Sequence, residues 1–244
     1  LIEKLPNLKF MVLTGARASS LDDKAATDRG IPISNTPGGG SNASTAELSW
    51  ALLMMCARDL AKGERLMRAG GWHDGIEQMV VLEGKRLGVI GLGRLGSRVA
   101  GYAKAFGMDV VAWSQNLTEE KAAKGGATLV SKAELLKTSD FVSIHLVLSD
   151  RTRGLLGAAD LAKMKKTAIL VNTSRGPIVD EAALIAALKD GTIAHAGLDV
   201  YDKEPVPKDY PLTKLENVTL IPHLTLRRSP HEGAEFSRLR VGVL

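Results

Sequence analysis

An arginine, a glutamate and a histidine in the second half of the chain each follow an apolar run of the kind that forms a strand. Arg175 lies in Asn-Thr-Ser-Arg-Gly-Pro, Glu204 precedes a proline, and His223 follows Ile-Pro. An arginine binds a carboxylate through its planar fork, and a histidine transfers protons. Taken singly, a glutamate or a histidine at such a position is more often solvated or structural. Together at the strand ends of one sheet, the three could perform acid–base chemistry on a carbonyl group beside a carboxylate.

A glycine-rich segment indicates a nucleotide. The motif G-x-G-x-x-G stands between an apolar strand expected over 86–90 and a helix expected over 97–106. In such a unit the first glycine permits a tight turn, the second lets the backbone approach a pyrophosphate, and the third lets the helix pack closely on the strand. The free N–H groups at the helix start then hold the phosphates. The cofactor-binding residues predicted from this turn are Gly91, Gly93, Arg94, Leu95 and Gly96.

Two further strand ends bear on the cofactor. Ser114 follows the second strand, where an NAD-binding unit carries an acid for the ribose 2′-hydroxyl. No acid stands there, and no arginine follows closely to hold a 2′-phosphate, since only Lys121 is near. The preference between NAD and NADP therefore stays open, with NAD as the working prediction. Asp199 ends another strand, where its carboxylate can accept a hydrogen bond from a carboxamide.

The elements that must position these residues alternate from Lys85 onward. We expect strands over 86–90, 108–113, 140–146, 168–172, 193–198 and 218–221, with helices over 97–106, 118–124, 131–137, 158–164 and 180–189. This alternation predicts an α/β fold, a doubly wound parallel sheet with helices on both faces. Ligands of such sheets bind outside the carboxyl ends of the strands, where the residues singled out above lie.

The first part of the chain has shorter units. A strand over 9–13, a helix over 21–29 and a strand over 31–34 resemble the end of a domain whose first half is absent. A helix from Thr45 towards Met67, which Ser44 or Thr45 can cap, is apolar nearly all round at first and should be buried between two bodies. Trp72, just beyond it, is expected to be a packing residue.

Composition limits the classes of protein that fit. Of 244 residues, 45% are hydrophobic and 24% charged, as in a globular domain. No apolar run reaches the roughly 18 residues of a membrane span, and residues 1–10 are too polar for a signal peptide. The single cysteine, Cys56, is expected to be a core thiol and fits a reducing cytoplasm. The net charge is +5, but the basic residues are scattered along the chain and aromatic residues are few. We therefore predict no nucleic-acid partner.

Four motifs in this order resemble the D-isomer-specific 2-hydroxyacid dehydrogenases, the family of phosphoglycerate dehydrogenase and glyoxylate/hydroxypyruvate reductase. They are the glycine turn, Asn172-Thr173-Ser174-Arg175-Gly176, Gly197-Leu198-Asp199-Val200 with Glu204-Pro205, and Pro222-His223. The resemblance runs from about residue 8 to about residue 223. It implies a Rossmann NAD(P)-binding domain over 42–225, a remnant of a flavodoxin-like substrate domain over 1–41, and an atypical tail over 226–244.

The resemblance also implies roles for individual residues. His223 would be the general acid/base, Glu204 would tune and orient it, and Arg175 would bind the carboxylate and carbonyl oxygen of the substrate. The backbone of Ala16 and Arg17 would bind the same carboxylate. Thr45 would lie near the nicotinamide, and the predicted cofactor-binding set becomes Gly91, Gly93, Arg94, Leu95, Gly96, Ser114, Thr173, Asp199 and Thr45. No metal site is expected.

The implied activity is NAD(P)-dependent interconversion of a small D-2-hydroxy acid and a 2-keto acid by a homodimer. Glu204 speaks against formate, because the related formate dehydrogenases carry glutamine there. Three features depart from the family: the missing first segment, Ser114 in place of an acid, and a tail in which Pro230 and Gly233 do not suit a returning helix. The alternative function is a cofactor-binding pseudoenzyme or a corepressor-like interaction module.

Overall fold

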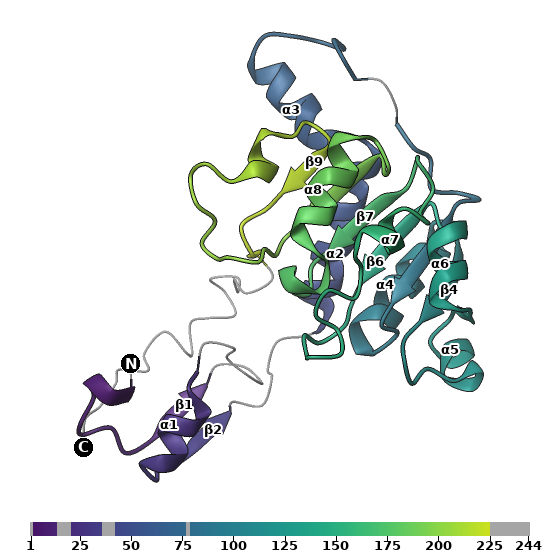
Figure 1. Ribbon diagram of the computed structural model, residues 1–244. Coiled ribbons are helices and arrows are strands. Elements are labelled where there is room, and N and C mark those ends of the chain that lie inside the picture. The colour runs from purple at the N-terminus through teal and green to yellow at the C-terminus, as the bar shows by residue number, and fades with distance from the viewer. Residues whose placement is uncertain (1, 14–20, 36–41, 77–78, 225–244) are drawn as a thin grey trace. The chain divides into compact units, whose positions relative to one another are not determined.

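The structure is a computed structural model that describes residues 2–13, 21–35, 42–76 and 79–224 (Figure 1). The described residues up to Asn35 belong to one compact unit, and those from Asn42 to Leu224 belong to another. The roles of these two units as a substrate domain and a nucleotide-binding domain stay predictions. The predicted tail over 226–244 lies outside the described residues.

The first unit is a small parallel pair of strands with one helix. β1 (Met11–Leu13) and β2 (Ile33–Asn35) pair with Met11 opposite Ile33. Between them in the chain lies α1 (Asp23–Asp28), and a 3-10 helix, η1 (Ile2–Lys4), precedes β1. Among the described residues of this unit, the buried core side chains are Ile2, Ala26 and Ile31, with partly buried apolar residues packed against them. Both expected strands are present but shorter than predicted, and η1 was not predicted.

The second unit is built on a seven-stranded parallel sheet with the order β5-β4-β3-β6-β7-β8-β9. This confirms the predicted doubly wound α/β fold. The order reverses beside β3, because the chain moves outward through β4 to β5 and then returns to place β6 on the other side of β3. The strands are β3 (Arg86–Ile90), β4 (Asp109–Trp113), β5 (Thr128–Leu129), β6 (Phe141–Ile144), β7 (Ile169–Asn172), β8 (His195–Leu198) and β9 (Val218–Leu220).

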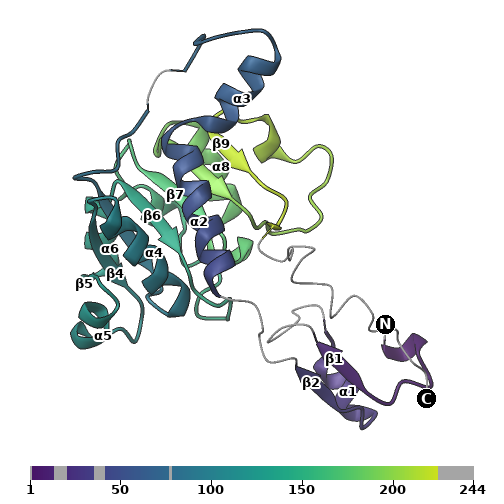
Figure 2. The same cartoon turned by 180° about the vertical axis from the view of Figure 1, so that it is seen from behind.

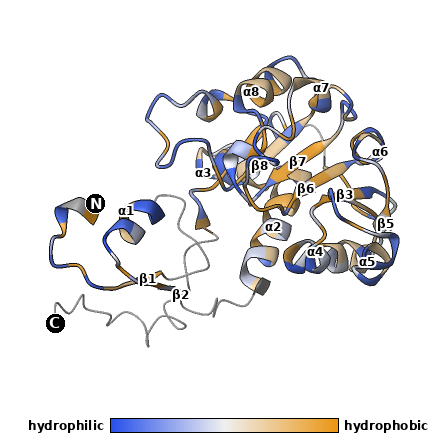
Figure 3. Cartoon of the chain, turned by 60° about the horizontal axis from the view of Figure 1, so that its bottom comes forward, coloured by the Kyte–Doolittle hydropathy of each residue, from blue (hydrophilic) through white to orange (hydrophobic). Residues whose placement is uncertain are grey.

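Helices cover both faces of this sheet (Figures 1 and 2). α2 (Asn42–Ala57) and α4 (Arg94–Ala105) pack on one face, and α6 (Lys132–Thr138), α7 (Ala158–Leu161) and α8 (Glu181–Lys189) pack on the other. α5 (Glu119–Lys124) lies beside β5. The central strands β6 and β7 are mainly hydrophobic (Figure 3) and are buried at every position, because both of their faces are covered.

Several helix starts follow the capping chemistry of the sequence. The Ser131 side chain accepts a hydrogen bond from the Glu134 backbone N–H at 3.1 Å. The Thr118 hydroxyl accepts from the Lys121 N–H at 3.3 Å. These side chains satisfy N–H groups that have no partner within the helix. The starts predicted for α5 and α6 are thus confirmed.

The prediction of one long helix from Thr45 towards Met67 is wrong in two respects. α2 begins at Asn42, so Ser44 and Thr45 lie inside its first turn and do not cap it. The helix also ends at Ala57, and α3 (Leu60–Arg68) begins after Asp59, whose φ of 46° is left-handed. A left-handed residue cannot continue a right-handed helix, and aspartate tolerates this conformation better than most residues do.

Two other expectations have opposite outcomes. Trp72 is 65% exposed, so its predicted packing role within this unit is wrong. Cys56 is buried, and burial raises the pKa of its thiol to about 12, which confirms a core thiol without nucleophilic character.

α4 begins at Arg94, three residues before the predicted start. Among the described residues, no helix is long and apolar enough to cross a membrane.

Candidate active site

The glycine turn has the geometry that its motif predicts. Gly91 has a φ of 97°, and a Cβ there would lie 2.8 Å from the carbonyl oxygen of His145. Gly93 is open, with no atom within 4 Å of the position that its Cβ would occupy. A Cβ at Gly96 would collide with the carbonyl oxygen of Gly91 and would lie 3.0 Å from Val89 Cγ1. The turn is therefore tight, accessible from outside, and closely packed on β3.

The start of α4 offers a place for phosphate groups. Its N-cap residue is Gly93, and no side chain caps it. The first backbone N–H groups, those of Arg94, Leu95 and Gly96, therefore point out of the helix without a capping partner, and the helix dipole favours negative charge there. The open space over Gly93 lets a ligand approach the backbone closely. These residues fit the pyrophosphate of a dinucleotide.

The end of β4 lies directly beside the glycine turn. The Trp113 carbonyl oxygen accepts a hydrogen bond from the Gly91 N–H at 2.9 Å. Ser114, the next residue, is half-buried, and its carbonyl oxygen accepts from the Leu117 N–H at 3.1 Å. The structure thus places Ser114 at the strand end next to the turn, where the sequence argument expects the ribose.

The loop after β7 is held in shape by its own side chains. The Asn172 amide donates to the Arg175 carbonyl oxygen at 3.0 Å and accepts from the Ser174 N–H at 3.0 Å. The Ser174 hydroxyl donates to the carbonyl oxygen of Ile144, at the end of β6, at 2.8 Å. Arg175 itself is exposed, and its guanidinium donates to the Ser174 carbonyl oxygen at 2.6 Å. A fixed loop therefore presents an arginine fork to solvent.

Glu204 and His223 form a hydrogen-bonded pair. His223 Nδ1 lies 2.5 Å from Glu204 Oε2, and because a carboxylate only accepts, Nδ1 is the donor. The second carboxylate oxygen, Oε1, accepts from the Tyr201 N–H at 2.9 Å. The His223 side chain is 16% exposed, and its buried Nε2 atom has no hydrogen-bond partner among the described residues. His223 also has a φ of 49°, a rare conformation that clusters at functional sites.

Asp199 ties the ends of three strands together. Its side chain is fully buried, and Oδ1 accepts from the Leu224 N–H at 2.7 Å. Its own N–H donates to the Asn172 carbonyl oxygen at 3.0 Å. The Tyr201 hydroxyl donates to the Ile221 carbonyl oxygen at 2.8 Å, and burial raises the pKa of this phenol, which keeps it a donor. The segments after β7, β8 and β9 are thus fixed to one another.

The backbones that follow β7 and β8 also touch directly. A Cβ at Gly176 would collide with the main chain of Tyr201 and Asp202. The loop that carries Arg175 is therefore pressed against the segment that leads to Glu204.

The structure brings most of the predicted residues to one edge of the sheet. Arg175, Glu204 and His223 follow the neighbouring strands β7, β8 and β9, and Thr45 and Thr173 lie on opposite sides of a buried serine, Ser49. Among the described residues, no hydrogen bond or ion pair joins Arg175 to Glu204 or His223. The predicted substrate-binding residues Ala16 and Arg17 lie outside the described residues.

Sequence reasoning assigned no role to His145, which directly follows β6 beside the glycine turn. His145 Nε2 lies 2.9 Å from the Ser143 hydroxyl, and the buried Nδ1 has no partner among the described residues. Burial lowers the pKa of His145 to about 4, so the imidazole is neutral at pH 7. The position after a strand at the point where the sheet order reverses was the signal that could have identified it.

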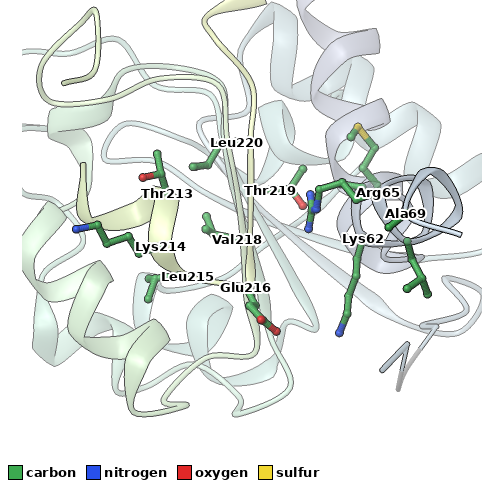
Figure 4. A pocket seen from close by; sticks show the side chains of 13 residues that line it. Lys62, Arg65, Ala69, Thr213, Lys214, Leu215, Glu216, Val218, Thr219 and Leu220 are labelled. Carbon is green, nitrogen blue, oxygen red and sulfur yellow. The ribbon is translucent and has the colours of Figure 1, made fainter. Parts of the chain in front are cut away.

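A groove of about 640 Å³ lies elsewhere on the same unit (Figure 4). Lys62 and Arg65 of α3 form one side, and the other side comes from η3 (Pro211–Lys214) and β9. It contains none of the predicted site residues. The described residues also contain no group of His, Cys, Asp or Glu that could hold a metal ion. The candidate site is therefore the edge of strand ends and not this groove.

The fold and the glycine turn define the class as a dinucleotide-binding α/β protein. Residues 50–225 match the family model described as D-isomer specific 2-hydroxyacid dehydrogenase, NAD binding domain. The chain belongs to this family, and it is an NAD-dependent dehydrogenase that acts on CH–OH donors.

Individual relatives agree with this assignment. The chain is 44% identical over 251 residues to a glyoxylate reductase from Aeropyrum pernix, covering 100% of this chain and 73% of that protein. It is 42% identical over 243 residues to D-3-phosphoglycerate dehydrogenase from Archaeoglobus fulgidus, covering 100% of this chain but only 45% of the relative. A solved phosphoglycerate oxidoreductase from Vibrio cholerae superposes with a TM-score of 0.87 at 34% identity, over 93% of this chain and 73% of that one.

Proposed function

We propose that this protein interconverts a small D-2-hydroxy acid and the corresponding 2-keto acid, with His223 as the general acid/base. The observation that carries the proposal is the His223–Glu204 pair, in which one ring nitrogen is held by a carboxylate and the other is buried with no partner in the part of the chain that the structure describes. A buried donor or acceptor without a partner is costly, so a substrate oxygen is a natural partner for Nε2.

Bound NADH supplies the hydride that reduces the keto carbon. In that direction, His223 donates the proton on Nε2 to the carbonyl oxygen as negative charge develops there. Glu204 holds Nδ1 and stabilises the positive charge of the protonated ring. The Tyr201 N–H, in turn, holds the carboxylate of Glu204 in place. In the oxidation direction, the neutral ring accepts the proton from the hydroxyl group.

Arg175 is proposed to bind the substrate carboxylate. Its guanidinium is exposed and presently donates to the carbonyl oxygen of the adjacent Ser174, a partner that a charged carboxylate can replace. The fork geometry of arginine matches a carboxylate with two parallel bonds. Its positive charge also offsets the charge that develops on the neighbouring carbonyl oxygen.

Cofactor contacts are proposed at the glycine turn, at three residues that follow strands, and at Thr45 on α2. The N–H groups of Arg94, Leu95 and Gly96 would hold the pyrophosphate, and Ser114 would bind a ribose hydroxyl. Asp199 would accept from the carboxamide, beside Thr45 and Thr173. The Asp199 carboxylate already accepts one backbone hydrogen bond, so its orientation is fixed before any ligand binds.

The substrate is proposed to be a small 2-keto acid such as glyoxylate or hydroxypyruvate, and the names of relatives such as the Aeropyrum pernix glyoxylate reductase support the first of these. We further propose that the protein is a homodimer and acts in the cytoplasm. The dimer is supported by the exposed apolar side chains of α3 and the segment after it, and the cytoplasm by the presence of a single, buried cysteine.

The proposal is tested by steady-state reduction of glyoxylate, hydroxypyruvate and pyruvate with NADH, using the parent and two variants. We expect His223→Ala to lower turnover by roughly 10²–10⁴ while the affinity for NADH stays the same. We expect Arg175→Lys, which keeps the charge but loses the fork, to raise KM for the keto acid strongly. Parent-like turnover in His223→Ala would remove this residue from the mechanism. No turnover of any keto acid by the parent would contradict the proposed reaction.

A further inference from the structure

One buried hydroxyl joins two segments that are 124 residues apart in the sequence. Ser49, on α2, is 1% exposed. Its Oγ lies 2.7 Å from the Thr45 carbonyl oxygen, one turn earlier in the same helix. The same Oγ lies 2.6 Å from Thr173 Oγ1, in the loop that follows β7. Figure 2 shows α2 lying against the sheet at β7, which agrees with the contacts between these elements.

The direction of each of these two hydrogen bonds follows from the chemistry of the groups. A carbonyl oxygen only accepts, so the single hydroxyl proton of Ser49 goes to Thr45. Ser49 Oγ must then accept from Thr173, whose side chain is also buried. The order of donation is therefore Thr173 to Ser49 to Thr45. The two short bonds polarise each other in the same direction, which strengthens a chain of hydrogen bonds.

The two outer members of this row of hydrogen bonds, Thr45 and Thr173, lie in segments to which we assign a part in the reaction. Thr45 lies in the first turn of α2, and Thr173 begins the loop in which Asn172 and Ser174 hold the backbone of Arg175. The larger apolar residues of α2 that pack on the sheet, Leu52 and Leu53, lie further along the helix, and the small Ala46 lies before Ser49. Ser49 is thus placed where the helix reaches the carboxyl edge of the sheet.

We propose that Ser49 is a positioning residue that fixes the first turn of α2 against the Arg175 loop. It touches neither substrate nor cofactor. By orienting the Thr173 hydroxyl and the Thr45 backbone, it keeps the cofactor contacts and the carboxylate contact at a fixed separation. This inference rests on the proposed function, because it assumes that Thr45 and Thr173 face the cofactor and that Arg175 binds the substrate.

The critical variant is Ser49→Ala, which leaves the Thr173 hydroxyl buried without its acceptor. We expect the dissociation constant of NADH, measured by fluorescence titration, to rise on the order of tenfold. KM for glyoxylate should rise by a similar factor, because the loop of Arg175 is no longer held by Thr173. The melting temperature should fall by a few degrees, because the buried Thr173 donor loses its partner, but the fold should stay intact. Ser49→Thr, which retains a hydroxyl, should restore both constants to within about threefold of the parent.

Thr138→Val is the matched control. Thr138 on α6 makes the same type of bond, from its hydroxyl to the carbonyl oxygen of Glu134 at 2.8 Å, but has no link to a strand-end loop. This variant should leave the NADH dissociation constant and KM unchanged. If it moves both constants as Ser49→Ala does, the effect is a general property of a lost hydroxyl in a helix, and the proposal is wrong.

A folded Ser49→Ala protein with parent-like NADH affinity and KM would overturn the proposal. Should Ser49→Ala fail to fold, Ser49→Cys replaces it, because a thiol of similar shape donates and accepts only weakly. The same rise in both constants is then expected, and its absence overturns the proposal. The NADH titration does not depend on turnover. A chain that binds NADH but reduces no keto acid would thus refute the proposed reaction, while the titration still decides the role of Ser49.

Discussion

Single side chains at the strand ends are fixed by partners in the same segment or after a neighbouring strand. Glu204 is held by the Tyr201 N–H and in turn holds His223, and Asp199 is bonded to the segment after β9. Such arrangements reduce the reorganisation that a reaction requires, because the dipoles are already oriented. The residues that sequence motifs identified are therefore supported by neighbours that the motifs do not contain.

Ser114 should determine how strictly the protein distinguishes NAD from NADP. A hydroxyl can bond the ribose but does not repel a 2′-phosphate, so we expect the parent to prefer NAD only by on the order of tenfold, about 1.4 kcal/mol. Ser114→Asp should sharpen the preference by weakening NADP binding, since a carboxylate repels the phosphate. Titration of both cofactors measures this. Ser114→Asn, which is similar in size but neutral, serves as the control, and a parent that prefers NADP a hundredfold would refute this interpretation.

At this scale, local chemistry was predictable and long-range partners were not. The glycine turn follows from a few adjacent residues, and the structure has it, whereas Ser44 and Thr45, predicted to cap a helix, lie inside α2. The bond between Ser49 and Thr173 joins positions that only the folded sheet brings together. Likewise, no sequence spacing shows that His145 lies half-buried beside the glycine turn.

Among the elements, α4 contains two glycines with different surroundings. Gly96 faces β3 at a distance that excludes a side chain, whereas Gly101, on the same helix, has no atom within 4 Å of its would-be Cβ. The first glycine is needed for close helix–strand packing. The second lowers the helix propensity without a packing reason in this unit.

These two glycines give a matched pair of variants. Gly101→Ala should stabilise the protein by about 0.5–1 kcal/mol through helix propensity. Gly96→Ala should destabilise it by about 1–3 kcal/mol, because the added methyl overpacks the contact with the turn, and it should weaken NADH binding. Urea unfolding and NADH titration measure both effects. An equal gain in stability from both substitutions would show that the close contact at Gly96 is not required.

Element boundaries were less predictable than element order. The alternation of apolar strands and helices predicts six strands of the sheet, and the seventh, β5, which has only two residues, was not predicted. The break at Asp59 carries no glycine or proline, so nothing in the local sequence separates α2 from α3. Tertiary packing decides such boundaries, and a pattern of hydrophobic residues alone does not.

For the whole molecule, we predict a homodimer whose interface includes α3 and the segment after it. Exposed apolar side chains gather there, on Leu60, Met67, Trp72, Met79 and Val81. A patch of this kind marks an interface more often than a free surface. Light scattering should give twice the monomer mass. Trp72→Glu should shift the protein towards monomer, whereas Val147→Glu, at an exposed apolar residue outside this segment, should not; a monodisperse parent monomer would contradict the prediction.

The stability of the whole molecule should also fall in mild acid. Burial lowers the pKa of His145 to about 4 and also lowers the pKa of His195. As the pH drops below about 6.5, these histidines bind protons in the unfolded chain but stay neutral in the folded chain. The free energy of unfolding therefore decreases until about pH 4. For His145 alone, the loss between pH 7.5 and pH 5 is about 2 kcal/mol.

Urea unfolding at these two pH values tests this expectation. His145→Gln keeps a group that can bond Ser143 but does not titrate, so it should remove most of the loss, with His195 accounting for a smaller remainder. His73→Gln, at an exposed histidine, is the control and should leave the loss unchanged. An equally acid-sensitive His145→Gln variant would show that other groups are responsible.

The contact of Gly176 with the main chain of Tyr201 and Asp202 has an evolutionary consequence. Two backbones that touch without any side chain between them leave no position at which mutation can adjust their separation. Arg175 and Glu204 therefore stand on two backbones whose separation is fixed, and a substitution at Gly176 would disturb both residues at once. We expect changes in substrate preference to arise instead at side chains around these two segments, for example at the exposed Val147, which a protein engineer would randomise first.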